Sequence, residues 1–205
     1  MRAVLVANPK GGSGKTTVSI NIAAALAHAG RRTLLLDLDR QRSASTWTSI
    51  RPGHLPPVYA FRPHPDAQPP KGDWLVIDSP AGIHGKTLSH ALKLADRIVV
   101  PLQPSLFDMS ATSEFLGELL REKVVRGRRV RVGVVGVRVD PRTKAASTLA
   151  AFLGQFDLPV LGYLRDSQTY PNAAFNGLSI FDMAPSIVER DQASWQPIVD
   201  WVTAE

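Results

Sequence analysis

The sequence predicts an α/β fold in which helices cover both faces of a mostly parallel central sheet. Short apolar runs, many of them rich in β-branched residues, alternate with segments of helical character along the chain. This alternation is typical of parallel strands joined by crossover helices. The runs are almost continuously hydrophobic, as expected for strands that are buried on both faces.

Six apolar runs are predicted to form the strands: residues 3–7, 33–37, 74–78, 97–101, 130–137 and 160–163. Six further segments are predicted to be helices: residues 15–29, 86–94, 110–126, 143–155, 169–176 and 191–202. Gly30 follows the first of these helices, where a glycine C-cap is common. Asp108 is the predicted N-cap of the third helix.

Residues 51–72 interrupt this rhythm because seven of these 22 residues are prolines. Proline is incompatible with a helix interior or a central strand, so the segment is predicted to be a mostly extended surface excursion. Its one candidate strand is an edge strand at residues 58–61. A connecting role is favoured over that of a dedicated partner-binding loop.

Composition indicates one globular domain over residues 1–205, because 44% of the residues are hydrophobic and the length allows a sizeable core. No apolar run approaches the roughly 20 residues of a membrane span. The first predicted strand begins at the start of the chain and leaves no room for a signal peptide, so a cytoplasmic location is expected. Cysteine is absent, which excludes disulfides, thiolate metal sites and cysteine-held iron–sulfur clusters.

The formal net charge of +6 and the pI of about 10 suggest a polyanionic partner, most simply DNA bound through its phosphates. A general solubility charge is the alternative. The basic residues gather, however, between positions 121 and 144, where Glu122 and Asp140 are the only acids. This clustering favours the polyanion. The basic residues are Arg121, Lys123, Arg126, Arg128, Arg129, Arg131, Arg138, Arg142 and Lys144.

A glycine-rich loop lies between the first predicted strand and the first predicted helix. Residues 10–17 read Lys-Gly-Gly-Ser-Gly-Lys-Thr-Thr. Strand, glycine loop and helix in this order are the setting of a phosphate-binding loop. The glycines permit a tight backbone whose N–H groups can surround phosphates, and the helix N-terminus adds its positive dipole end. The residues predicted to bind nucleotide here are Gly11, Gly12, Ser13, Gly14, Lys15, Thr16 and Thr17.

Within this loop, Lys15 is predicted to reach the β- and γ-phosphates of ATP, and the Thr16 hydroxyl to ligate Mg²⁺. The ordinary pattern has glycine at position 9, where this chain has Pro9, and an additional lysine, Lys10, precedes the glycine pair. The octapeptide resembles the deviant Walker A motif of the ParA/MinD superfamily, above all that of the small ParA-type partition and positioning ATPases. That resemblance implies a P-loop NTPase fold.

In that family, the lysine that Lys10 matches crosses a dimer interface and touches the nucleotide of the other subunit. The resemblance therefore implies a homodimer when ATP is bound. It also implies that Lys10 and Lys15 both take part in the hydrolysis of ATP to ADP.

Residues 34–39, Leu-Leu-Leu-Asp-Leu-Asp, form a hydrophobic strand that ends in two carboxylates. Ligands of open α/β sheets bind at the carboxyl ends of strands, so Asp37 and Asp39 should open toward the glycine loop, on one face while the strand persists. The pattern resembles the family's Asp-x-Asp-Pro-Gln motif. By that match Asp39 would polarise the attacking water, and Asp37 would support Mg²⁺ or the Lys15 region. Arg40 stands where proline is usual, which leaves the geometry of this loop open.

A second acid-capped strand, residues 74–78, resembles a Walker B segment. Asp78 would hold a Mg²⁺-bound water, and the backbone of Gly82 could approach the γ-phosphate. Weaker similarities, at residues 137–140 and 164–166, assign Arg138 and Arg165 to the nucleotide, near its base.

The resemblance implies a Mg²⁺-dependent, ATP-dimerising ATPase that binds DNA nonspecifically and positions a cargo on the nucleoid. A partner or adaptor protein would stimulate its hydrolysis. The cargo, whether a plasmid, a chromosome or a protein assembly such as a microcompartment, cannot be read from the sequence.

Two alternatives remain within the superfamily. A MinD-like membrane-cycling ATPase needs a basic amphipathic helix, whereas residues 191–205 are acidic and are predicted to be interrupted by Pro197, so no membrane partner is expected. An ATP-dependent metabolic ligase needs a pocket for a small substrate, and the sequence offers no additional acid–base constellation for one.

Overall fold

The computed structural model describes residues 1–62 and 71–204, and there it forms one seven-stranded sheet in which every strand pairing is parallel. This confirms the predicted fold class. The strand order is β3-β2-β4-β1-β5-β6-β7. The strands are β1 (Arg2–Val6), β2 (Thr33–Asp37), β3 (Val58–Phe61), β4 (Trp74–Asp78), β5 (Arg97–Leu102), β6 (Arg131–Gly136) and β7 (Val160–Tyr163).

The edge strand expected within the proline-rich excursion is present as β3. It pairs with β2 in register from Thr33 opposite Val58 to Leu36 opposite Phe61. Residues 63–70 of the predicted excursion lie outside the described residues.

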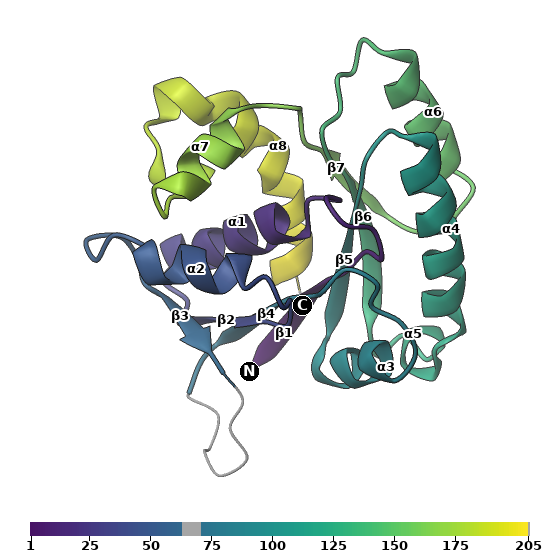
Figure 1. Ribbon diagram of the computed structural model, residues 1–205, viewed down its shortest axis with the longest axis horizontal. Helices are drawn as coiled ribbons and strands as arrows, with labels where there is room; N and C mark the ends of the chain where they lie inside the picture. Colours follow the sequence, from purple (N-terminus) through teal and green to yellow (C-terminus); the bar gives the residue numbers. More distant parts are fainter. Residues whose placement is uncertain (63–70, 205) are drawn as a thin grey trace.

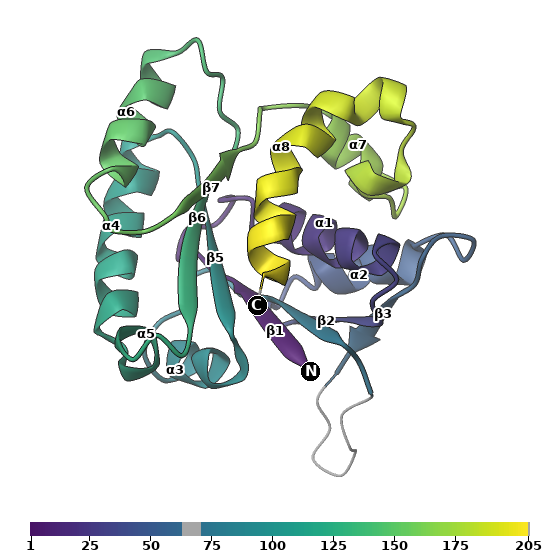
Figure 2. The ribbon, with the colours of Figure 1, turned by 180° about the vertical axis from the view of Figure 1, so that it is seen from behind.

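Helices cover both faces of the sheet, as Figures 1 and 2 show from opposite sides. One face carries α1 (Lys15–His28), α2 (Ser43–Ile50), α7 (Thr169–Phe175), the short 3₁₀ helix η1 (Ile180–Asp182) and α8 (Pro185–Thr203). The other face carries α3 (Gly85–Leu94), α4 (Leu106–Arg121), α5 (Lys123–Arg126) and α6 (Lys144–Leu153). Alternate strand residues therefore enter two separate cores: Val4 and Val6 pack under α1, while Leu5 packs on the other face.

Helix α1 is the element that presents the glycine loop, and it is buried along most of its length between the sheet and the other helices of its face. It ends where Gly30 adopts a φ of +73°. The Gly30 N–H bonds the Ala27 carbonyl at 3.0 Å, and the Arg31 N–H bonds the Leu26 carbonyl at 3.0 Å. These two bonds form a Schellman motif, so Gly30 ends the helix as predicted.

The segment predicted as one helix over residues 110–126 is two helices. The first, α4, begins earlier, at Leu106, because Ser105 rather than Asp108 is the N-cap: its hydroxyl accepts the Asp108 N–H at 3.2 Å. The prediction of Asp108 as N-cap was wrong by three residues. Glu122 then leaves the helical region, with φ −61° and ψ 132°, and separates α4 from α5.

The last helix also differs from its prediction. It begins at Pro185, six residues before the predicted start, with proline in its first turn, where the missing N–H has no helical partner to lose. It then continues through Pro197, which is exposed, so the expected interruption is wrong. No helix within residues 1–62 and 71–204 is both long and apolar enough to cross a membrane.

Candidate nucleotide-binding site

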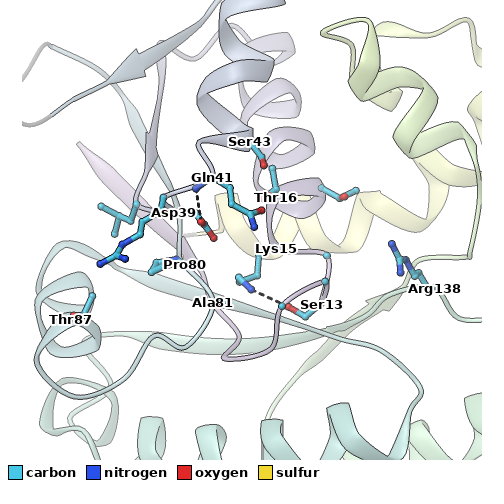
Figure 3. Close-up of a pocket in the computed structure, with 16 residues that line it drawn as sticks. Ser13, Lys15, Thr16, Asp39, Gln41, Ser43, Pro80, Ala81, Thr87 and Arg138 are labelled. Carbon is cyan, nitrogen blue, oxygen red and sulfur yellow. Dashed lines mark hydrogen bonds between the residues drawn. The ribbon is translucent and has the colours of Figure 1, made fainter.

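A cleft of about 770 Å³ opens beside the glycine loop at the carboxyl ends of β2 and β4 (Figure 3). Its walls come from the glycine loop, the segments that follow β2, β4 and β6, and the helices α2 and α3. The lining residues are Gly11, Gly12, Ser13, Gly14, Lys15, Thr16, Thr17, Leu38, Asp39, Arg40, Gln41, Ser43, Pro80, Ala81, Thr87 and Arg138. The seven predicted loop residues therefore do line one cleft.

The loop adopts a backbone that depends on glycine at two positions. Gly12 has φ +74° and Gly14 has φ +86°, in the left-handed region that other residues rarely adopt. A Cβ at Gly14 would lie only 3.3 Å from Cγ2 of Val137. The loop is thus packed tightly against the end of β6, which fixes its position beside the cleft.

Lys15 is buried at the start of α1. Its ammonium donates to the Lys10 carbonyl at 2.7 Å and lies 3.4 Å from the Ser13 hydroxyl (Figure 3 draws the latter contact). Burial lowers the pKa of Lys15, and the negative charges of Asp78 and Asp39 oppose that shift. The lysine therefore bridges the two ends of the loop and holds a positive charge beside the cleft.

Asp78 connects β4 to α1 through two hydroxyls. It accepts hydrogen bonds from Thr16 at 2.8 Å and from Ser19 at 2.9 Å. Burial raises the pKa of Asp78 to about 6, although both hydroxyl bonds act to lower it. The sequence analysis missed Ser19, yet its position three residues after Thr16 places both hydroxyls on one helix face.

Hard oxygen donors of this kind suit Mg²⁺. The described residues contain no group of three or more His, Cys, Asp or Glu side chains that could hold a metal ion. A Mg²⁺ ion here would accordingly need phosphate oxygens and water in addition to Thr16 and Asp78.

The two acids at the end of β2 diverge. Asp37 is buried, and its two oxygens accept the backbone N–H groups of Asp39 at 3.0 Å and of Ser45 at 2.8 Å. Asp39 lines the cleft, where it accepts the Gln41 N–H at 2.9 Å (Figure 3). The shared face that strand alternation predicts does not extend to Asp39, because β2 ends at Asp37. Metal support by Asp37 stays a prediction.

Lys10 is half-buried and is not among the residues that line the cleft. Its N–H bonds the side-chain oxygen of Asn8 at 2.9 Å. The Asn8 amide in turn donates to the Pro101 carbonyl at 2.8 Å and to the Thr112 hydroxyl at 2.9 Å. Asn8, which the sequence analysis missed, therefore ties the loop to β5 and α4. Its place directly after the first apolar run was the available signal.

Two further hydrogen bonds join the glycine loop to neighbouring segments. The Gln103 amide donates to the Gly12 carbonyl, and the sequence analysis assigned Gln103 no role. The Gly82 N–H donates to the Pro9 carbonyl at 2.8 Å. The segments after β4 and β5 thus both touch the glycine loop.

A second cleft of about 350 Å³ adjoins the first and shares Gly14, Thr17 and Arg138 with it. Arg138 has a left-handed φ of +55°, uncommon for a residue with a side chain and frequent at functional sites. Arg165 also lines this cleft, but its guanidinium makes a bidentate pair with Asp191, both contacts at 2.8 Å. The structure brings together the predicted site residues, except that Lys10, Asp37 and Asp78 do not line either cleft. Asp78 is connected to the first cleft through its bond to Thr16.

The family pattern described as "CobQ/CobB/MinD/ParA nucleotide binding domain" matches residues 4–180. The chain is 30% identical over 206 residues to maintenance of carboxysome distribution protein A of Gloeobacter kilaueensis, covering 97% of this chain and 93% of that protein. It is 31% identical over 191 residues to the chromosome-partitioning ATPase Soj of Thermus thermophilus, covering 75% and 76%.

Among solved structures, the septum site-determining protein MinD of Pyrococcus horikoshii, complexed with Mg-ADP, superposes with a TM-score of 0.75 at 17% identity. The match covers 99% of this chain and 96% of that one. A similarity at this level of identity shows the common fold.

Proposed function

The chain belongs to the CobQ/CobB/MinD/ParA nucleotide-binding family, and on that premise we propose that it is a Mg²⁺-dependent ATPase that positions a cargo. The relatives that match most of its length support this proposal, since one is a carboxysome-distribution protein and another is a chromosome-partitioning ATPase. We also propose that residues 1–205 act as one ATPase domain.

The observation that carries the proposal is that Lys15 and Thr16 line the same cleft. Lys15 donates there to the Lys10 carbonyl, and Thr16 donates to Asp78. A triphosphate in the glycine loop would offer Lys15 anionic oxygens in place of the neutral Lys10 carbonyl. Mg²⁺, when bound, would neutralise phosphate charge, with the Thr16 hydroxyl as a ligand and Asp78 as the acceptor for a bound water. The second cleft, with Arg138 at its junction with the first, is the proposed place of the base.

Hydrolysis of this kind depends on positioning and electrostatics rather than on covalent chemistry. Asp39, which lines the cleft, is the proposed acceptor that orients the attacking water. Lys10 lies outside the cleft of its own subunit, which is compatible with the proposal that it acts on the nucleotide of a second subunit. ATP binding and homodimer formation would then be coupled.

Such coupling supplies a switch. An ATP-bound dimer carries twice the basic surface of an ADP-bound monomer, and nonspecific affinity for DNA depends steeply on the number of phosphate contacts. The protein would bind the nucleoid as a dimer and leave it after hydrolysis, which a partner or adaptor protein stimulates. Its proposed location is therefore cytoplasmic and nucleoid-associated.

The test is phosphate release from ATP by the purified protein with no added metabolite. We expect turnover that ceases on Mg²⁺ chelation with EDTA and that is lost in Lys15→Ala and reduced in Thr16→Ala. Exposed Lys144 supplies the matched control, Lys144→Ala, which should retain the wild-type rate. Wild-type protein that binds no ATP at millimolar Mg²⁺ would contradict the proposal.

The same assay separates the two alternatives. A metabolic ligase would turn over ATP only when a small carboxylate substrate is supplied, whereas a positioning ATPase should respond to DNA and to an adaptor. Co-sedimentation with anionic liposomes in the presence of ATP would identify a membrane-cycling protein. We expect no such co-sedimentation, because α8 carries acids such as Glu189 and Asp200 rather than a basic face.

A further inference from the structure

A surface turn away from the nucleotide cleft concentrates positive charge. It runs from the end of α4 through α5 into the start of β6, and we call it the α5 basic turn. Its exposed basic residues are Arg121, Lys123, Arg126, Arg128, Arg129 and Arg131. With six basic residues against the single acid Glu122, residues 121–131 carry a formal charge of +5, compared with +6 for the whole chain.

The structure divides the basic stretch that the sequence presents as one cluster. The α5 basic turn precedes β6, at the amino ends of the strands, beside α3 (Figure 1). Arg138, Arg142 and Lys144 follow β6, at the carboxyl ends, where the nucleotide cleft lies. The two groups therefore occupy opposite edges of the sheet, and of these residues only Arg138 lines the nucleotide cleft.

The charges of the α5 basic turn are not neutralised by neighbouring acids. The ion pairs recorded for residues 1–62 and 71–204 all involve other basic residues. Glu122, the acid within the turn, is directed toward α3, where it accepts the Ser89 hydroxyl at 3.1 Å. The six cations are thus available to an external anion.

Neighbouring strands add to the positive potential. Three adjacent strands, β1, β5 and β6, begin with Arg2, Arg97 and Arg131, and Arg97 lies directly opposite Arg131. Burial lowers the pKa of Arg97, the charges of Arg131 and Arg2 lower it further, and the charge of Asp96 opposes the shift. Like charges opposite each other disfavour a sheet, so a polyanion bound at exposed Arg131 would offset part of its repulsion with Arg97.

The backbone of the turn is held in place. Arg128 has φ +55°, its N–H bonds the Val125 carbonyl at 2.9 Å, and the Val130 N–H bonds the Val124 carbonyl at 3.0 Å. Val125 and Val130 are both buried. The basic side chains therefore extend from a fixed platform, and little backbone ordering is required when an anion binds.

We propose that the α5 basic turn is the surface that binds the phosphate backbone of duplex DNA, without sequence preference. This inference rests on the proposed function and names the surface through which the DNA partner binds. The six exposed cations supply the positive charge that nonspecific binding to DNA phosphates requires. A lipid surface is disfavoured because Val125 and Val130 are buried, so α5 presents mainly basic side chains rather than the broad apolar face of a membrane-binding helix.

The test compares two double variants with equal loss of charge. Arg126→Gln/Arg129→Gln alters the α5 basic turn, and Lys144→Gln/Arg190→Gln removes two exposed cations on α6 and α8. Affinity for random-sequence duplex DNA is measured against salt concentration, with AMPPNP bound. We expect the first variant to bind more weakly, with a salt slope smaller by about 2 per subunit, and the control to keep the wild-type slope.

The single variants Arg126→Gln and Arg129→Gln should each reduce the slope by about half as much, and unchanged AMPPNP affinity verifies that they are folded. A wild-type slope in the first variant, with the loss appearing in the Lys144/Arg190 control, overturns the assignment and leaves the proposed function standing. A wild-type protein that binds no DNA at low salt overturns both. The assignment is also overturned if the wild-type protein binds anionic vesicles and only the α5 double variant loses that binding while it still binds DNA as the wild type does.

Discussion

At the scale of residues, the glycine loop is held in place by its own backbone geometry and by side chains from outside it. Gly14 shows the first effect, since its φ of +86° and its contact with Val137 both require the absence of a side chain. Asn8 and Gln103 show the second, because they connect the loop to segments about 90 residues away in the chain.

Asp37 and Asp39 have different surroundings. Asp37 accepts backbone N–H groups of the segment that follows β2, whereas Asp39 lines the nucleotide cleft. We expect Asp39→Ala to lower ATP turnover about a hundredfold or more, because loss of a group that accepts a proton or orients water has that magnitude. Nucleotide affinity should change little, so the variant should remain dimeric and DNA-bound with ATP.

The measurement is phosphate release together with equilibrium binding of a fluorescent ATP analogue. Asp140→Ala changes a half-buried acid that follows β6 and lines neither cleft; it serves as the control and should behave as wild type in both assays. If Asp39→Ala hydrolyses ATP normally, the catalytic assignment passes to another acid, and Asp37 is the next to test.

At the scale of elements, the strands were predicted most accurately, because buried parallel strands are short and continuously apolar. Helix α2 was missed, since its sequence Ser-Ala-Ser-Thr-Trp-Thr-Ser-Ile has little intrinsic helix preference. Tertiary contacts stabilise it instead: Ala44 and Trp47 are buried, and the Trp47 indole donates to the Leu178 carbonyl at 3.0 Å. Such contacts cannot be read from a local pattern.

The end of α2 is fixed to η1 by a buried ion pair. Arg51 stacks over Trp47 at 5.0 Å and makes a bidentate pair with Asp182 at 2.8 and 2.9 Å. Burial acts to raise the pKa of Asp182, but hydrogen bonds from Arg51, Ser179 and His28 outweigh it and hold that pKa well below its ordinary range. The pair therefore joins two segments of the same face that are 131 residues apart.

We expect Arg51→Ala to lower the free energy of unfolding by about 3 kcal/mol, because it leaves a buried carboxylate without its main partner. The matched control is Arg142→Ala, which removes an exposed arginine–aspartate pair of similar geometry and should leave stability almost unchanged. Urea denaturation at neutral pH measures both. Equal midpoints for the two variants would show that the buried pair contributes no more than the exposed one.

At the scale of the whole molecule, the structure places its two charged surfaces at opposite edges of one sheet. The nucleotide cleft lies at the carboxyl edge and the α5 basic turn at the amino edge. The proposed dimer would form through Lys10 at the carboxyl edge, so both α5 basic turns would stay exposed. The nucleotide would then control DNA binding through the number of α5 basic turns in the assembly, two in a dimer and one in a monomer. No change of shape within one subunit would be needed.

This arrangement was only partly predictable. The sequence indicated the sheet, the glycine loop and the excess of positive charge. It did not show that residues 121–131 and 138–144 lie at opposite edges, because that separation depends on the position of β6 between them. A strand of six residues carries the chain from one edge of the sheet to the other.

The central claim is that Lys10 completes the ATP site of a second subunit, and mixing two inactive variants tests it most directly. Lys10→Ala keeps its own Asp39 but cannot supply the lysine, whereas Asp39→Ala supplies Lys10 but cannot orient water. Each alone should hydrolyse almost no ATP. A mixture of the two should recover part of the wild-type turnover, because a mixed dimer contains one complete site. A mixture that stays as inactive as its components, under conditions where both variants bind ATP, would contradict the claim.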